Sequence, residues 1–166
     1  MTAYRKSPGV VLGGAIGLLA HLACGGALAG TPAAAPEIPV AAQEAGPARP
    51  SHPGGTGPAV GLTGDAERGA VLFRDTCVVC HGPEGKDDVK NPGSTDGTVP
   101  PLNPIDPTLV GKSAAEFAGN VDLFLEHGSR PDGLKPEREM PAWGDTRALS
   151  PQQIADLIAY VIRLNK

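Results

Sequence analysis

The chain has few of the residues that build a large core or a disulfide scaffold. Its 166 residues include one Trp, two Tyr, three Phe, three Cys and two Met. Three cysteines are too few for a disulfide framework, and an aromatic fraction of 4% excludes a large aromatic core. An excess of basic residues is also missing, since the net charge is −4, and this excludes nucleic acid as an electrostatic partner. A core this small is often supplemented by a metal or another staple.

Glycine and proline, in contrast, are abundant. The 23 Gly and 18 Pro make up about a quarter of the chain, which is near the level typical of low-complexity segments. The length suits one domain with extra segments. Part of the chain is therefore expected to be unstructured.

The N-terminal 29 residues have the plan of an export signal. Arg5 and Lys6 precede a stretch from Val10 to Ala29 that is apolar or Gly throughout, apart from His21. Flanking positive charge and the position in the chain favour export over a buried helix of the fold. Residues 1–29 are therefore predicted to be a signal peptide or a lipoprotein or membrane anchor.

Three fates of this segment stay open. The small-residue triplet that ends at Ala29 suits cleavage, Cys24 suits lipidation as in a bacterial lipoprotein, and the apolar stretch is just long enough to remain as an anchor. Without residues 1–29, which hold two of the 14 basic and none of the 18 acidic residues, the charge becomes −6.

The next segment, residues 30–62, reads as a linker. Of its 33 residues 21 are Ala, Gly or Pro, and neither helical nor strand periodicity is present. A linker of this length suits a tether between an anchor and a folded head. It favours membrane association through the N-terminus.

Residues 63–166 are predicted to form an all-α domain of three to five helices with long loops. One helix is expected from a cap at Thr63 or Asp65 to about Val79, because apolar residues recur there at helical spacing. Capping signals at Ser113 and Ser150 predict two more helices, the first ending near Gly128, with the Gly119-Asn120 pair as a possible break.

The stretches 82–112 and 128–148 are expected to be loops. The first holds six prolines and no periodicity. A loop this long is unusual in a compact domain unless something is wrapped inside it, and a large buried cofactor is one such thing.

The motif that carries chemistry is Cys77-Val78-Val79-Cys80-His81. Positions i, i+3 and i+4 place both thiols and the imidazole on one face of a helical turn. Two thiols can then reach the two vinyl groups of one porphyrin, and the imidazole can reach its iron. The pattern C-x-x-C-H therefore predicts covalent attachment of haem c.

The motif has three other interpretations. A thioredoxin-like redox pair needs a βαβ context, and no strand pattern surrounds Cys77. A zinc site needs four ligands, whereas the other histidines are scattered and a second cysteine pair is missing. A structural disulfide between Cys77 and Cys80 is the third alternative.

The group that fills the sixth coordination position of such an iron decides the function. Met140 is the favoured candidate, since it lies about 60 residues after the motif and Pro141 restricts its backbone to an extended conformation. His127 is the alternative ligand. A lone Met can also serve only to fill an apolar gap.

With these residues in view, the chain resembles the class I c-type cytochromes, and in particular the small monohaem domains in the haem subunits of cbb3-type oxidases. The resemblance covers residues 64–166. It depends on three groups of residues: Gly69, Phe73, Cys77, Cys80 and His81; Met140 to Gly144; and the run from Leu149 through Val161.

The resemblance implies a small cytochrome c fold around one haem. Its first and last helices cross at Gly69, packing near Tyr160. It implies His81 as the proximal and Met140 as the distal ligand, and Pro100 as the carbonyl that accepts the histidine ring N–H.

The function expected from these residues and this resemblance is single-electron transfer without bond chemistry. Partners are then an electron donor and an acceptor protein, and a membrane oxidase or reductase complex is a candidate for either. The expected location is the bacterial periplasm, tethered to the membrane. The alternative is a haem-based sensor of gas or peroxide, or an enzyme, with an open sixth position.

Overall fold

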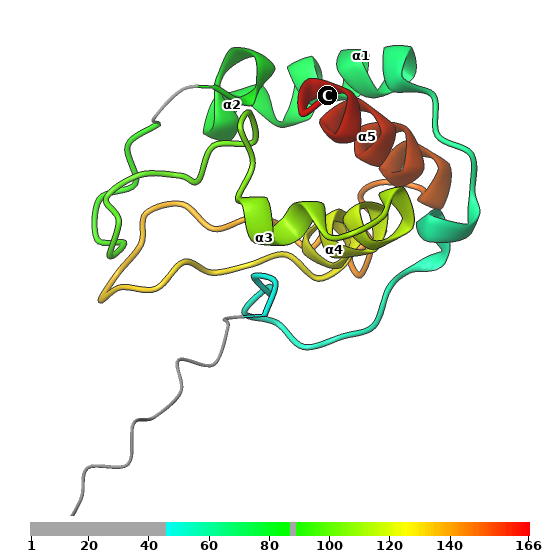
Figure 1. Ribbon diagram of the computed structural model, residues 1–166. Coiled ribbons are helices and arrows are strands. Elements are labelled where there is room, and N and C mark those ends of the chain that lie inside the picture. The colour runs from blue at the N-terminus through cyan, green and yellow to red at the C-terminus, as the bar shows by residue number, and fades with distance from the viewer. Residues whose placement is uncertain (1–45, 87–88) are drawn as a thin grey trace, which may run out of the picture. The chain divides into compact units, whose positions relative to one another are not determined.

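A computed structural model describes residues 46–86 and 89–166 (Figure 1). In these ranges the secondary structure is helical, with two isolated β-bridges and no strand. The α-helices are α1 (Ala66–Thr76), α2 (Val78–His81), α3 (Pro107–Val110), α4 (Ala114–His127) and α5 (Pro151–Leu164), and the 3-10 helices are η1 (Pro58–Gly61) and η2 (Pro83–Gly85). The prediction of an all-α fold with three to five helices is confirmed.

Helix α1 begins where the sequence predicts and ends earlier. The Asp65 side chain caps it by accepting the backbone N–H groups of Glu67 and Arg68. The predicted helix to Val79 is interrupted at Cys77, which separates α1 from α2. The Thr76 hydroxyl donates to the carbonyl of residue 72 at 2.6 Å, a local bond that competes with a continuing helix.

Helix α4 runs without a break through Gly119 and Asn120 and ends at Gly128, whose φ is 66°. The Ser113 hydroxyl caps its start by accepting the backbone N–H of Glu116 at 3.1 Å. The Glu116 carboxylate accepts from the Lys112 amide instead of completing a capping box.

Helix α5 has the full capping box that the sequence indicates. The Ser150 amide donates to Gln153 Oε1 at 2.9 Å, and the Gln153 amide donates to Ser150 Oγ at 3.3 Å. Pro151 occupies the first turn, where its missing N–H costs nothing.

Helices α1 and α5 pack closely against each other (Figure 1). A Cβ atom on Gly69 would lie 2.0 Å from the carbonyl oxygen of Asp156 and 2.8 Å from the Cβ of Tyr160. Only glycine permits this approach of the two backbones. The rings of Phe73 and Tyr160 meet beside it, with centroids 5.2 Å apart and planes tilted by 55°. The crossing implied by the family resemblance is thus present.

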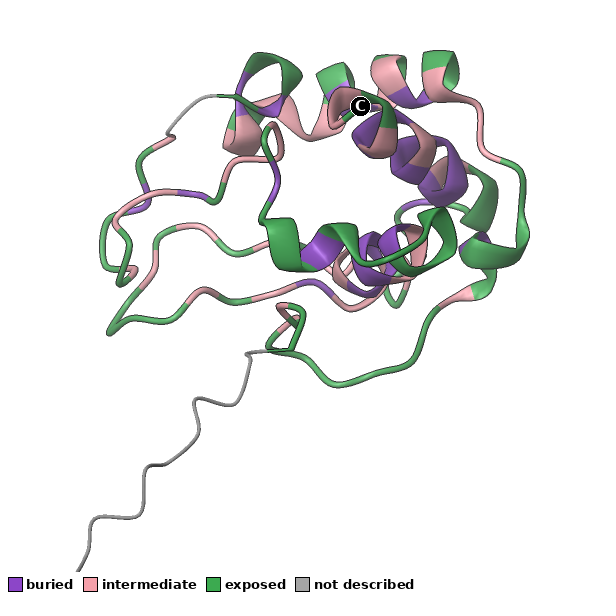
Figure 2. Cartoon of the chain, viewed as in Figure 1, coloured by how far each residue is buried: buried purple, intermediate pink, exposed green. Residues whose placement is uncertain are grey.

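The core lies between these helices and α4. Figure 2 shows the buried face of α5, which turns toward α1 and α4. The buried apolar residues of the core come from α1, α4 and α5 and include Phe73, Phe117, Val121, Leu125, Ile154, Leu157, Ile158 and Val161. Burial of such side chains contributes about 1.5–3 kcal/mol each, which stabilises the packing of these helices.

The described structure differs from the expected linker over part of its length. Residues 46–62, hereafter the docked segment, lie against the domain through backbone groups. The amide of Ala48 donates to a side chain of α3, that of Gly57 to a side chain of α4, and that of Ser51 to a side chain of the loop after α4. Ala59 is buried. Because backbone atoms make these contacts, they produce no periodic pattern of side chains from which the sequence could predict them. Residues 1–29 and 30–45 lie outside the described residues.

The expected loop 82–112 contains a short α-helix, α3, which was not predicted. Asp106 caps α3 by accepting the Thr108 amide at 2.8 Å, and Pro107 follows as its first residue. This Asp-Pro pair is a helix-start signal of the same kind as Ser150-Pro151.

None of the helices within residues 46–86 and 89–166 is both long and apolar enough to cross a membrane.

Candidate functional site

The three motif residues lie on one helical turn, hereafter the attachment turn (residues 77–81). The amides of Cys80 and His81 both donate to the Cys77 carbonyl, at 3.1 and 2.9 Å. Both cysteines are free thiols and both are partly buried. The alternative of a disulfide between them is not observed, and the turn presents two sulfurs and an imidazole together.

The environment of Cys77 keeps its thiol protonated. Burial raises the pKa of Cys77, and this outweighs the nearby Thr76 hydroxyl, which lies 3.3 Å from the sulfur and favours the thiolate. Reactive redox cysteines have a lowered pKa instead. No strand precedes the turn in the described residues, so the thioredoxin-like interpretation lacks both its fold and its chemistry.

His81 is oriented by a backbone carbonyl from the following loop. Its Nδ1 lies 3.2 Å from the carbonyl oxygen of Pro100. A carbonyl only accepts, so Nδ1 carries the proton and Nε2 keeps its lone pair in the neutral ring. Burial lowers the pKa of His81, and the bond to Pro100 opposes this only in part. The expected Pro100 contact is confirmed, and it leaves Nε2 available to a metal.

Met140 lies on a loop that returns to the same part of the molecule. Its amide donates to the Ser129 carbonyl at 2.8 Å, and the Ser129 amide donates to the Met140 carbonyl at 3.0 Å. Two residues upstream, the Arg138 guanidinium Nη1 lies 4.0 Å from the sulfur of Cys80. The fold therefore brings the methionine loop to the attachment turn, across about 60 residues of sequence.

Several apolar side chains pack against the core and stay only partly buried, among them the candidate site residues Cys77 and Met140. Val78, Leu102, Phe124 and Trp143 share this property. Half-buried apolar side chains of this kind can contact a flat apolar group. The available donors are thiol sulfur, imidazole nitrogen and thioether sulfur, which is the set that haem c uses.

A zinc site finds no support in the same region. Among the residues that the structure describes, no three His, Cys, Asp or Glu side chains gather closely enough to hold a metal ion. Structural zinc needs four such ligands.

His127, the alternative sixth ligand, is committed elsewhere. Its Nδ1 lies 2.9 Å from Asp145 Oδ2, and its Nε2 lies 2.7 Å from the carbonyl oxygen of Gly55. Both partners are acceptors, so both ring nitrogens carry protons and neither has a lone pair for iron. The side chain is also only 11% exposed, because the docked segment covers it.

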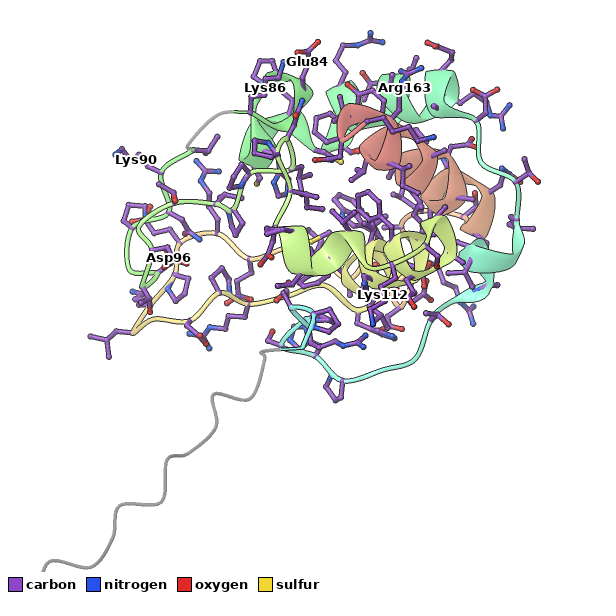
Figure 3. All side chains as sticks on the ribbon, viewed as in Figure 1. Glu84, Lys86, Lys90, Asp96, Lys112 and Arg163 are labelled. Atoms are coloured by element: carbon purple, nitrogen blue, oxygen red, sulfur yellow. The ribbon has the colours of Figure 1, made fainter. Side chains whose placement is uncertain are left out.

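The outer surface of the attachment turn combines apolar and charged groups. Val79, between the two cysteines, is 70% exposed. Glu84 and Lys86 form an exposed ion pair of 2.8 Å just after the turn, and Figure 3 shows both, with Lys90, at the outside of the molecule. The turn is therefore accessible to another protein.

A family comparison agrees with this site. The family model described as Cytochrome c matches residues 66–165, more than half of the chain. The matched range contains the attachment turn, Met140 and all five α-helices. Comparisons with curated proteins and with solved structures gave no match. The likeness to domains of cbb3-type oxidases remains a prediction. The chain belongs to the cytochrome c family, whose domains carry covalently bound haem c and transfer electrons.

Proposed function

We propose that this protein is a single-electron carrier in which Cys77 and Cys80 attach one haem c and His81 and Met140 bind its iron axially. The observation that carries the proposal is the orientation of His81. Its Nδ1 proton is held by Pro100, its Nε2 has no hydrogen-bond partner among the described residues, and the loop that bears Met140 meets the same turn.

When bound, the haem supplies a one-electron iron couple, and Met/His ligation favours its reduced form. The protein residues supply orientation and exclusion. Pro100 holds the His81 ring, and the paired backbone of Ser129 and Met140 holds the thioether. With both axial positions taken by side chains, small molecules are kept from the iron. Rigid ligands also keep the geometry change between oxidation states small.

The redox partners are proposed to be proteins that meet the attachment turn. Val79 offers an exposed apolar contact there, and the neighbouring charges form a polar rim. Brief electron-transfer encounters use small interfaces of this kind. A membrane oxidase or reductase complex is a candidate for either partner.

The proposed location is the bacterial periplasm, with the N-terminus as a membrane tether. Support comes from the basic and apolar pattern of residues 1–29 and from the linker composition of residues 30–45. Mass spectrometry of the mature protein would read the cleavage site, a lipid on Cys24 and the haem together. A mature chain that starts at residue 30 without a lipid would contradict the tether and leave export intact.

The attachment is tested by replacing Cys77 and Cys80 with Ala. Covalent haem survives denaturing electrophoresis, so wild type is expected to retain haem in the gel and the double variant to lose it. A double variant that still holds haem after denaturation would contradict the proposed attachment.

The axial ligand is tested with Met140→Leu, because leucine conserves apolar volume and removes only the sulfur. The variant is expected to bind carbon monoxide in its reduced form, to lose the sulfur–iron absorption band and to have a lower reduction potential. Wild type is expected to resist carbon monoxide. A wild-type protein that binds it readily would contradict the carrier function and favour a gas or peroxide sensor, or an enzyme, with an open iron.

A further inference from the structure

Two long loops of the domain are joined by one buried side chain and by backbone hydrogen bonds, among them Thr95 N–H to the Asp132 carbonyl at 2.7 Å and Glu137 N–H to the Pro92 carbonyl at 3.1 Å. The first loop, residues 89–102, follows the attachment turn and carries Pro100. The second, residues 129–141, carries Met140 and is called the ligand loop here. Asn91 of the first loop is fully buried, with 0% exposure. A buried amide must find partners for its polar atoms, and those of Asn91 come from the ligand loop.

The Asn91 side chain pairs with the backbone of Arg138 at both ends. Its Nδ2 donates to the Arg138 carbonyl at 3.0 Å, and its Oδ1 accepts the Arg138 amide at 2.8 Å. This pair of hydrogen bonds fixes the amide orientation, because the Nδ2 donor meets an acceptor and the Oδ1 acceptor meets a donor. The side-chain amide of Asn91 thereby pairs with the ligand loop in the way that a peptide group of a neighbouring chain segment would.

Asn91 is itself held firmly by its own loop. Its amide donates to the Gly97 carbonyl at 2.9 Å, and its carbonyl accepts the Ser94 hydroxyl at 2.8 Å. A bridge between Lys90 and Thr98 closes the same turn. The side chain is therefore presented to Arg138 from a fixed base.

The contact lies next to the proposed iron ligand. Arg138 is two residues before Met140, whose own amide and carbonyl pair with Ser129. The Arg138 guanidinium reaches back to the Lys90 carbonyl at 3.1 Å and approaches the sulfur of Cys80. The ligand loop is thus held at residue 138 by the Asn91 side chain, at residues 132, 135 and 137 by backbone bonds from the first loop, and at residue 140 by Ser129 at its own start.

We propose that Asn91 is a positioning residue for Met140, which holds the ligand loop where the thioether stays on the iron. The inference rests on the proposed ligation of iron by Met140. A thioether carries no charge and binds iron weakly, so small openings of its loop compete with the bond. Loss of two buried hydrogen bonds at residue 138 would favour such openings.

The test compares Asn91→Ala with Asn120→Ala in the haem-loaded protein. Asn120 is a matched control, because it is also buried and donates its Nδ2 to a backbone carbonyl, that of Leu109, at 3.0 Å. It joins α4 to α3 through this bond, and its side chain forms no hydrogen bond with either loop among the described residues. Both variants are expected to unfold at lower temperature than wild type.

Only Asn91→Ala is expected to alter the ligand. Its reduced form should bind carbon monoxide about tenfold faster than that of wild type, and its oxidised form should lose the sulfur–iron band at a lower pH. Asn120→Ala should match wild type in both measurements. If Asn91→Ala fails to load haem, Asn91→Asp replaces it in both measurements, with the same expected results. This variant keeps the acceptor for the Arg138 amide and loses the donor.

The outcomes separate the two proposals. An Asn91 variant that resists carbon monoxide and keeps its band as wild type does would overturn the positioning role while leaving the ligation intact. Equal effects of the Asn91 and Asn120 variants on the band would show a general loss of stability and overturn it too. A wild-type protein that binds carbon monoxide freely would overturn the ligation by Met140 itself.

Discussion

The Arg68 guanidinium and the Asp156 carboxylate form a two-point ion pair across the crossing of α1 and α5. Arg68 Nε lies 2.7 Å from Asp156 Oδ2, and Nη2 lies 2.9 Å from Oδ1. The Asp156 side chain is 3% exposed, whereas that of Arg68 is 57% exposed. The Asp65 amide and Gln152 also donate to Asp156. A buried carboxylate with this many donors stays ionised.

Acid is expected to destabilise the protein through Asp156. The hydrogen bond from Arg68 lowers the pKa of Asp156 from 3.8 to about 2. The stabilisation is therefore complete above the unfolded pKa, and it is lost as the pH falls through about 2. The shift corresponds to about 2 kcal/mol. Asp156→Asn should remove about this much from the free energy of unfolding at pH 7, measured with denaturant.

Arg74→Ala serves as the control for this ion pair. Arg74 and Asp75 lie 3.7 Å apart and are both exposed. Exposed pairs contribute little, so this variant should unfold like wild type at every pH. Equal acid sensitivity of wild type and Asp156→Asn would contradict the assignment to Asp156.

The helix crossing should not tolerate a side chain at Gly69. In Gly69→Ala the new Cβ would lie 2.0 Å from the Asp156 carbonyl oxygen, so the two helices must move apart. Overpacking of this kind costs about 1–3 kcal/mol. Thermal unfolding followed by circular dichroism would measure it.

Gly119→Ala is the matched control for Gly69→Ala. Gly119 also lies inside a helix, but a Cβ there would meet only the Thr56 side chain, at 3.6 Å, an ordinary contact. Because alanine favours helix, this variant should be more stable by about 0.5–1 kcal/mol. A destabilised Gly119→Ala with a tolerated Gly69→Ala would show that the crossing is described wrongly.

Stability is expected to decline with rising pH above neutrality because of His127. The hydrogen bond to Asp145 and the bond to the Gly55 carbonyl raise the pKa of His127. The negative charge of Glu126 raises the pKa of His127 further. Asp122 also faces His127, whose positive charge opposes in part the rise that burial causes in the pKa of Asp122. A raised folded pKa gives stability that is complete below 6.5 and is lost as the pH rises through the folded value.

Unfolding measured between pH 6 and pH 9 would check this expectation. His127→Gln should remove the pH-dependent step and cost about 1 kcal/mol at pH 6. Deletion of residues 1–57 removes Gly55 and should weaken the step, whereas deletion of residues 1–45 should leave it unchanged. A step of full size in both deletions would contradict the role of the docked segment.

Electron exchange is expected to depend on Val79. An added carboxylate in Val79→Asp would place charge on the proposed contact surface, so the self-exchange rate between reduced and oxidised protein should fall about tenfold. The reduction potential should change little, because the side chain points to solvent. Leu134→Asp, which adds the same charge at a fully exposed position on the ligand loop, is the control. Equal rates in the two variants would place the contact elsewhere.

Much of this domain was predictable because its signals are local. The caps at Asp65, Ser113 and Ser150 lie within three residues of the amides that they accept. The attachment turn needs only one helical turn. Pro100 and the Gly69 crossing followed from the family resemblance rather than from local patterns. The start of α3 was missed, although Asp106-Pro107 carried a signal of the same local kind.

The amino-acid sequence by itself determined the three long helices, the attachment turn and the candidate iron ligands, since each depends on residue types a few positions apart. Only the tertiary structure decided that residues 46–62 dock on the domain, that the Asn91 side chain hydrogen-bonds to the Arg138 backbone, and that both ring nitrogens of His127 have hydrogen-bond partners. These contacts join residues 47 to 79 positions apart. Several are made by backbone atoms, which every residue has, so no residue pattern could specify them.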